Sequence, residues 1–186
     1  MAGAMQLDQH GMVALSRASL GALRTALLRD AGPGGVAYLQ EAGFAGGEAL
    51  MASFRQWLGG RDARPVGGLD TESFRARAVE YFHETGWGHV SITPLSGALV
   101  AIDSDDWSES DPAAALPHPG CYLTSGLLAD FFSRVAEAPL TVMEVECRSM
   151  GHPRCRWLLG NGDALQAVYQ AMTEGVPYAE AAANLG

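Results

Sequence analysis

The feature that most constrains the fold is a pair of cysteines, Cys147 and Cys155, on either side of a short connection near the end of the chain. Apolar runs over residues 140–145 and 157–159 lead into and out of this connection, which contains a glycine and a proline. Such a pattern predicts two antiparallel strands joined by a turn. The third and last cysteine, Cys121, stands upstream at the start of an amphipathic segment. We therefore expect the fold to bring all of these sulfur atoms together.

Three thiolates and one further ligand make a four-coordinate zinc site, which is closed and therefore structural. The candidates for the fourth ligand are Glu144, Glu146 and His152. Side chains alternate along a regular strand, so Glu144 and Cys147 point to opposite faces unless the strand bulges or frays. The alternative is that the thiols are small buried side chains without a metal. The same connection carries the arginines expected to offset the negative charge of a metal site: Arg148, Arg154 and Arg156.

Charge and composition exclude several classes of protein. A net charge of −9 and a pI near 4.9 argue against nucleic acid as a directly bound partner. All 12 basic residues are arginine, so no lysine is available to form a Schiff base. The cysteines lack the spacing of a disulfide framework, and residues 1–10 lack the features of a signal peptide. No apolar run reaches the roughly 18 residues of a membrane span. We expect a cytoplasmic protein that does not enter a membrane.

Hydrophobic periodicity and turn residues predict helices interspersed with β-hairpins. The predicted helices cover residues 16–30, 36–58, 71–85, 120–135, 164–174 and 177–185, and the predicted strands cover residues 89–93, 99–102, 140–147 and 155–159. This order has no βαβ regularity and indicates an α+β domain on an antiparallel sheet of about four to five strands. Three glycines interrupt the second helix and allow close helix contact or a kink: Gly43, Gly46 and Gly47.

Three motifs carry a resemblance to the 4-vinyl reductase domain family. They are Cys121-Tyr-Leu-Thr-Ser-Gly126, Val142-Met-Glu-Val-Glu-Cys147 and Met150-Gly-His-Pro-Arg-Cys155-Arg-Trp157. Gly86-Trp-Gly88 and Glu174-Gly-Val-Pro-Tyr178 also fit, and the resemblance covers about residues 69–185. It implies a fold similar to that of Golgi-transport tethering subunits, which tends to form homodimers. Residues 1–68 are then a helical arm for dimerisation or packing, and residues 69–186 are the ligand-binding domain.

Members of this family bind small hydrophobic molecules, and they include the sensory domains of bacterial phenol- and xylene-responsive activators. Carried over position by position, the resemblance implies a structural zinc held by Cys121, Glu144, Cys147 and Cys155. A hydrophobic ligand needs an apolar hollow with a few polar anchors. The candidate walls are Phe82, Trp87, Trp107, Tyr122, Phe131, Phe132 and Tyr169, and the candidate anchors are His83, His89 and Tyr122. Trp107, which lies in an acidic loop, loosely matches a pocket tryptophan of the phenol sensors.

These observations favour a zinc-containing, non-catalytic domain that binds or senses a small hydrophobic or aromatic molecule. The sequence shows no nucleophile–base pair and no nicotinamide or flavin fingerprint. The first alternative is a tetrapyrrole-binding accessory protein or reductase component of (bacterio)chlorophyll synthesis, because the family also includes a protein associated with that pathway. The second alternative is a tethering module with a filled interior.

Overall fold

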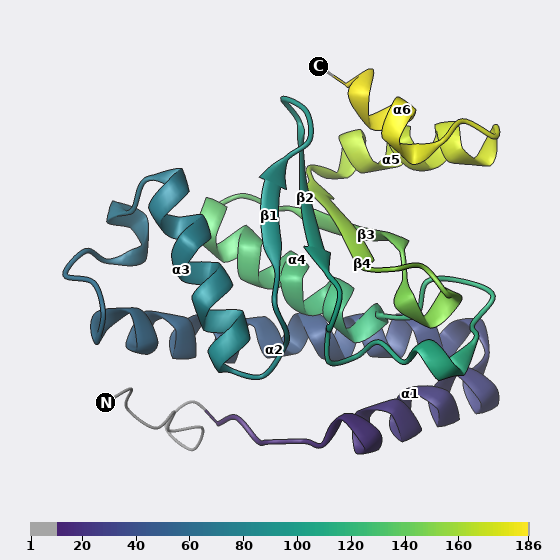
Figure 1. The fold of residues 1–186 in the computed structure, drawn as a ribbon, viewed down its shortest axis with the longest axis horizontal. Helices are drawn as coiled ribbons and strands as arrows, with labels where there is room; N and C mark the ends of the chain where they lie inside the picture. Colours follow the sequence, from purple (N-terminus) through teal and green to yellow (C-terminus); the bar gives the residue numbers. More distant parts are fainter. Residues whose placement is uncertain (1–10, 186) are drawn as a thin grey trace.

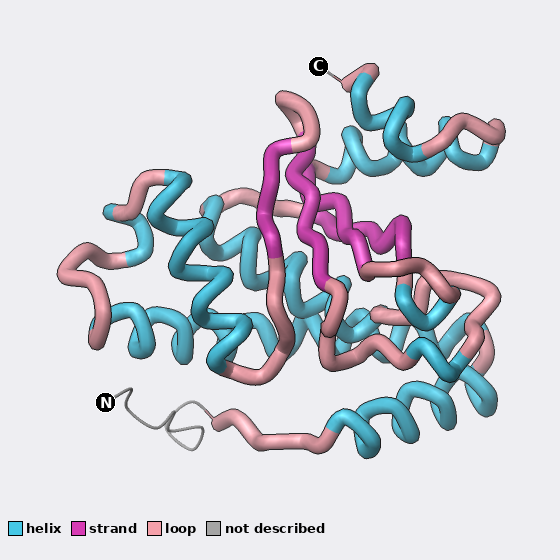
Figure 2. Tube along the Cα trace, in the orientation of Figure 1, coloured by secondary structure: helices cyan, strands magenta, loops and turns pink. Residues whose placement is uncertain are grey.

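The computed structural model describes residues 11–185 and shows helices packed on both faces of an antiparallel sheet (Figures 1 and 2). The helices are α1 (Arg17–Ala31), α2 (Pro33–Gly59), α3 (Thr71–Glu84), α4 (Tyr122–Ala136), α5 (Gly162–Thr173) and α6 (Tyr178–Ala183). The strands are β1 (Ser91–Pro94), β2 (Leu99–Ser104), β3 (Thr141–Glu146) and β4 (Cys155–Gly160), and short 3-10 turns lie at η2 (Val66–Gly68), η3 (Pro112–Ala114) and η4 (Arg148–Met150). The sheet order is β1-β2-β4-β3. The predicted α+β class and the two hairpins are confirmed.

Three of the element boundaries that differ from the prediction bear on the helix packing and the site. Helix α2 begins at Pro33, because Gly32, with a φ of 52°, ends α1 and proline is well tolerated in a first helical turn. Strand β2 continues to Ser104, into the segment expected to be an acidic loop. Cys121 is the N-cap of α4 and precedes its first turn. Residues 1–10, where no signal peptide is expected, lie outside the described residues.

The two faces of the sheet carry separate hydrophobic clusters. The inner face packs against α2, α3 and α4, in a core that includes Phe54, Phe82, Phe131 and Trp157. The outer face packs against α5 and α6, where the yellow-green and yellow helices of Figure 1 cover one end of the sheet. The predicted division at residue 68 stays a prediction, although α2 shares the inner core with α4. No helix within residues 11–185 is both long and apolar enough to cross a membrane.

Glycines set the separation of α2 and α4. A Cβ atom placed on Gly43 of α2 would lie 1.9 Å from the carbonyl oxygen of Leu123 in α4. A Cβ atom on Gly126 of α4 would lie 2.0 Å from the carbonyl oxygen of Gln40 in α2. Side chains at these positions would push the two backbones apart. The close helix contact that the sequence suggested is therefore present.

We expect Gly126→Ala to lower the free energy of unfolding by about 2–3 kcal/mol, because the new methyl group meets backbone that cannot move independently. Gly21→Ala in α1 is the matched control, since no atom lies within 4 Å of its added Cβ. That change should be neutral or stabilise by up to about 1 kcal/mol. Urea unfolding measures both changes, and equal effects would contradict the close crossing.

Candidate functional site

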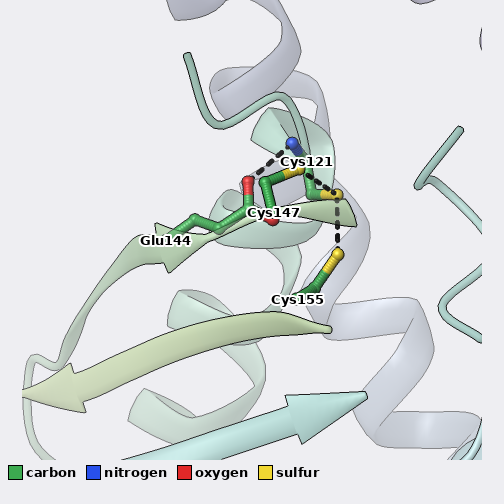
Figure 3. Close-up of side chains that lie close together, drawn as sticks. All are labelled: Cys121, Glu144, Cys147 and Cys155. Atoms are coloured by element: carbon green, nitrogen blue, oxygen red, sulfur yellow. Dashed lines mark hydrogen bonds between the residues drawn. The ribbon is translucent and has the colours of Figure 1, made fainter. Parts of the chain in front are cut away.

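Four side chains from three segments converge between α4 and the β3–β4 hairpin (Figure 3). Cys121 precedes α4, Glu144 and Cys147 come from the end of β3, and Cys155 opens β4. One potential ligand atom from each residue lies within 4.8 Å of the others. All three thiols are fully buried. The structure therefore brings together the four residues that the sequence resemblance selected.

A β-bulge in β3 makes this convergence possible. Glu144 pairs with Trp157 of β4, whereas Glu146 pairs with the adjacent residue Arg156, so the register shifts between them. One residue of β3, Val145, is therefore extra. Without the bulge, regular alternation would place the side chains of Glu144 and Cys147 on opposite faces of the sheet.

The side chains on either side of the bulge show its effect. Val145 packs against the outer cluster, and Glu146 also lies on the outer side, where it accepts hydrogen bonds from Arg154 and Tyr178. Two successive side chains thus share one face, and Cys147 returns to the face of Glu144. Glu146 is not part of the thiol cluster.

His152 also lies outside the cluster and supports it from the connection. Its Nδ1 atom accepts a hydrogen bond of 3.0 Å from the backbone N–H of Cys147. The backbone N–H of Arg148 lies 3.5 Å from Sγ of Cys155 and donates to it. Gly151, with a φ of 91°, allows the chain to turn back toward β4 after η4. The turn therefore supplies hydrogen bonds that orient the site.

The cluster has the dimensions of a tetrahedral metal site. Sγ of Cys121 lies 3.9 Å from Sγ of Cys147 and 3.8 Å from Sγ of Cys155. Two thiolates at the usual zinc–sulfur distance in a tetrahedron are about 3.8 Å apart. Oε2 of Glu144 accepts the N–H of Cys121 at 2.9 Å, and its buried Oε1 has no hydrogen-bond partner among the described residues. Three sulfurs and one free carboxylate oxygen fit zinc in number, type and spacing.

The electrostatics of the cluster also favour a cation. Burial, followed by the negative charge of Cys147, raises the pKa of Glu144 to about 9. Hydrogen bonds to Cys147 and Cys155, together with burial, raise the pKa of the Cys121 thiol well above its ordinary value. Acidic groups that share a buried space cannot all ionise unless positive charge neutralises them. A divalent metal supplies that charge and displaces the protons.

The arginines expected to offset the charge of the site do not all face it. Arg154 pairs with Glu146, and Arg156 makes two 2.6 Å contacts with Asp103, all on the outer side of the sheet. The prediction for these two arginines is wrong, because alternation along β4 directs Arg156 away from the face of Cys155. Arg148 donates to the hydroxyl of Ser110 at 3.2 Å.

Sequence reasoning missed Glu109, a buried carboxyl group that holds the first turn of α4. Its oxygens accept the backbone N–H groups of Leu123, at 3.1 Å, and Thr124, at 2.7 Å, and the hydroxyl of Thr124 at 2.6 Å. Trp107 in turn donates its indole N–H to that hydroxyl at 2.6 Å. Burial raises the pKa of Glu109. No local signal identifies this cap, because it lies outside the helix in an acidic loop.

The structure places most of the candidate pocket aromatics in the core. Trp107 is 1% exposed, although it lies in an acidic stretch of the sequence. Its ring stacks on Trp87 at a centroid distance of 5.5 Å and meets Phe82 edge-on at 5.8 Å. Phe131 and Phe132 are also buried, with their centroids 5.2 Å apart. These rings fill the inner core beside the thiol cluster, and their role in ligand binding stays a prediction.

The remaining candidates lie nearer the surface. Trp87 borders a hollow of about 320 Å³, which is lined by residues 12–15, 17, 20, 85–87, 108 and 123. The exposed rings of His83 and His89 lie at a centroid distance of 4.0 Å with their planes tilted by 34°, and His89 contacts Asp106 at 2.7 Å. Tyr122 is half-buried, and Tyr169 is exposed on α5. Of the candidate walls, Trp87 borders this hollow and stacks on the buried Trp107.

Residues 104–161 match the sequence profile of the 4-vinyl reductase domain, and this segment contains all four members of the cluster. The predicted resemblance to the 4-vinyl reductase domain family is confirmed over these residues. None of the curated protein sequences compared with the chain matches it.

Comparison with solved structures supports the fold. The chain is similar to the phenol-responsive sensory domain of the transcription activator PoxR, with a TM-score of 0.61, 21% identity, and coverage of 81% of this chain and 76% of the other. It is similar to trafficking protein particle complex subunit 3 from Naegleria fowleri, solved with covalently bound palmitic acid, with a TM-score of 0.62, 13% identity, and coverage of 77% and 91%. A vinyl-4-reductase family protein from Methanocaldococcus jannaschii gives a TM-score of 0.47, 18% identity, and coverage of 65% and 66%. The predicted likeness to tethering subunits is confirmed for the fold.

We expect Glu109→Ala to lower the free energy of unfolding by about 2–3 kcal/mol, because buried N–H groups of Leu123 and Thr124 lose their acceptors. Asp111→Ala is the matched control, since Asp111 caps only the short turn η3 near the surface. The Asp111→Ala change should lower the free energy of unfolding by less than about 1 kcal/mol. Chemical denaturation compares the two variants, and similar losses would show that Glu109 is not a buried cap.

Proposed function

We propose that this chain is a non-catalytic domain that binds a small hydrophobic or aromatic molecule and is held together by a structural zinc ion. The observation that carries the proposal is the buried cluster of three thiols and one carboxylate, with sulfur spacings of 3.8 and 3.9 Å. Four protein ligands complete a tetrahedral zinc site and leave no position for a substrate. The site therefore supports a scaffold and does not suggest metal catalysis.

The residues that would hold zinc are Cys121, Glu144, Cys147 and Cys155. When bound, the metal supplies a cross-link between the start of α4 and the ends of β3 and β4. These segments are 34 residues apart at their extremes, and each contributes to the inner core. Zinc in such a site contributes directly to folding free energy. The aromatic core next to the site then depends on the metal for its geometry.

Native mass spectrometry of the purified protein tests the zinc proposal. We expect about one zinc ion per chain, and Glu144→Gln should lower zinc retention because it removes an anionic ligand. Glu146→Gln is the matched control, because this neighbouring carboxylate points to the outer side of the sheet. Equal zinc loss from both variants, or less than about 0.2 zinc per chain in the unaltered protein, would refute the site. The same spectrum reports whether the chain is the homodimer that the family resemblance predicts.

The binding role is supported by three observations. The 4-vinyl reductase domain profile matches residues 104–161, and the fold resembles a sensory domain solved with phenol. The stacked pair Trp87 and Trp107 joins the apolar core to a surface hollow of about 320 Å³. Hollows of roughly 300–1,000 Å³ with apolar walls and few polar groups are typical of small-molecule sites. We infer that the hollow beside Trp87 admits a ligand with one or two rings.

Calorimetric titration with a panel of phenols, simple aromatic hydrocarbons and a tetrapyrrole tests this role. We expect a single-ring or two-ring compound to bind, and Trp87→Ala should weaken its binding roughly tenfold or more, because the ligand loses an aromatic wall. Tyr169→Ala is the matched control, since this aromatic side chain is exposed on α5. Binding of the tetrapyrrole alone would favour the pigment-related alternative, and binding of none of the compounds would favour the tethering alternative.

A further inference from the structure

Arg24 is a buried arginine that no sequence pattern singles out. It lies in α1 and is 1% exposed, whereas no other arginine among residues 11–185 is buried. Its Nη1 atom donates a 2.5 Å hydrogen bond to the backbone carbonyl of Glu109, and its buried Nε has no partner among the described residues. Burying a guanidinium with an unsatisfied donor is costly unless negative charge lies nearby. The position of Arg24 therefore requires a compensating interaction.

Arg24 is the buried residue of a helix whose other residues are exposed or half-buried. Helix α1 lies along α2 at the edge of the molecule (Figure 1). A hollow of about 560 Å³ separates part of α1 from residues 108–111, and the hollow beside Trp87 borders its first turn. Leu23, the neighbour of Arg24, is 50% exposed. Arg24 is the one fully buried side chain of α1, so the docking of this helix depends strongly on it.

The segment that Arg24 contacts leads directly to the thiol cluster. Arg24 binds the backbone of Glu109, and the Glu109 carboxylate binds the first turn of α4. That turn begins immediately after Cys121, the N-cap of α4. Burial raises the pKa of Glu109, and the charge of Arg24 opposes this rise. The buried positive charge therefore lies within electrostatic range of the Glu109 carboxylate, whose hydrogen bonds hold the turn that follows Cys121.

A zinc-loaded cluster would still carry a net negative charge, which a buried guanidinium such as that of Arg24 can stabilise. Three thiolates and a carboxylate exceed the charge of a divalent ion, so the site stays negative after zinc binds. Arg154 and Arg156 are paired on the outer side of the sheet and are not directed at this charge. Arg24 is buried on the inner side, next to the cap of α4. It is suited to stabilise the negative site without contacting the metal.

We propose that Arg24 is a positioning residue of the metal centre, which docks α1 onto the Glu109 segment and supplies buried positive charge, so that metal binding and α1 docking stabilise each other. The inference rests on the proposed zinc site and adds a coupling to it. Such coupling is reciprocal, because each event changes the free energy of the other by the same amount. The N-terminal helix is then part of the support of the metal centre.

Two measurements on Arg24→Met test the coupling: the rate of zinc transfer to a chelator, and hydrogen exchange of the α1 amides. We expect zinc transfer roughly ten-fold faster than in the unaltered protein. Loss of a residue that supports metal ligands from outside typically weakens metal binding about 10- to 100-fold, and we take the lower value. Exchange of α1 should also become faster. Arg29→Met is the matched control, because Arg29 lies in the same helix with an exposed side chain. Val168→Ala controls for general destabilisation, since Val168 is buried under the outer face of the sheet. Both controls should release zinc at the original rate.

The unaltered protein provides a test that needs no variant. Chelation of zinc should speed exchange in α1 more than in α5, which packs on the other face of the sheet. The proposal is overturned if α1 exchange is indifferent to zinc, or if Arg24→Met retains zinc as well as Arg29→Met does. A protein that binds zinc but shows either result refutes only the coupling. A protein that binds no zinc refutes the proposed site and the coupling together.

Discussion

One extra residue in β3 determines whether a metal site can exist in this fold. The bulge at Val145 turns two successive side chains outward, so that Glu144 and Cys147 share the inner face. Without it, the carboxylate and the thiol would lie on opposite sides of the sheet. On the outer side, Glu146 accepts hydrogen bonds from Arg154 and Tyr178, and these contacts hold the bulged strand in place. Local strand irregularity is thus used to build a site, as is common for bulges.

The start of α4 is where the separate parts of the domain meet. Glu144 accepts the N–H of Cys121, and Glu109 accepts the N–H groups of Leu123 and Thr124. Carboxylates at this position are favoured by the exposed N–H groups and by the helix dipole. Thr124 then connects the cap to Trp107 and so to the aromatic core. The same helix passes close to α2 through paired glycines. A change at the thiol cluster is therefore transmitted to both the aromatic core and the helix layer.

Sequence patterns predicted the elements well because their signals are local. Periodic apolar residues marked the helices, and the hairpins followed from turn residues and alternation. The candidate site was predicted partly through resemblance, which favoured Glu144 where strand alternation opposed it. Three of the misses have one physical cause. Glu109 and Trp107 stand in a polar stretch of the sequence and Arg24 is itself charged, but all three side chains are buried by segments remote along the chain. Their burial depends on contacts over 15 to 85 residues, which local patterns do not report.

Residue types and their spacing are enough to predict the class of fold and the reactive groups available: three cysteines, nearby carboxylates, no lysine and a net negative charge. Which of these groups meet depends on the packing of segments that are remote along the chain. The register shift in β3 chose Glu144 over Glu146, and alternation along β4 turned Arg156 away from the thiols. Packing of α1 against the Glu109 segment brought a single buried guanidinium toward the start of α4, among the residues that the structure describes. Residue types fix the available interactions, whereas burial and strand register fix which charges share a low-dielectric space.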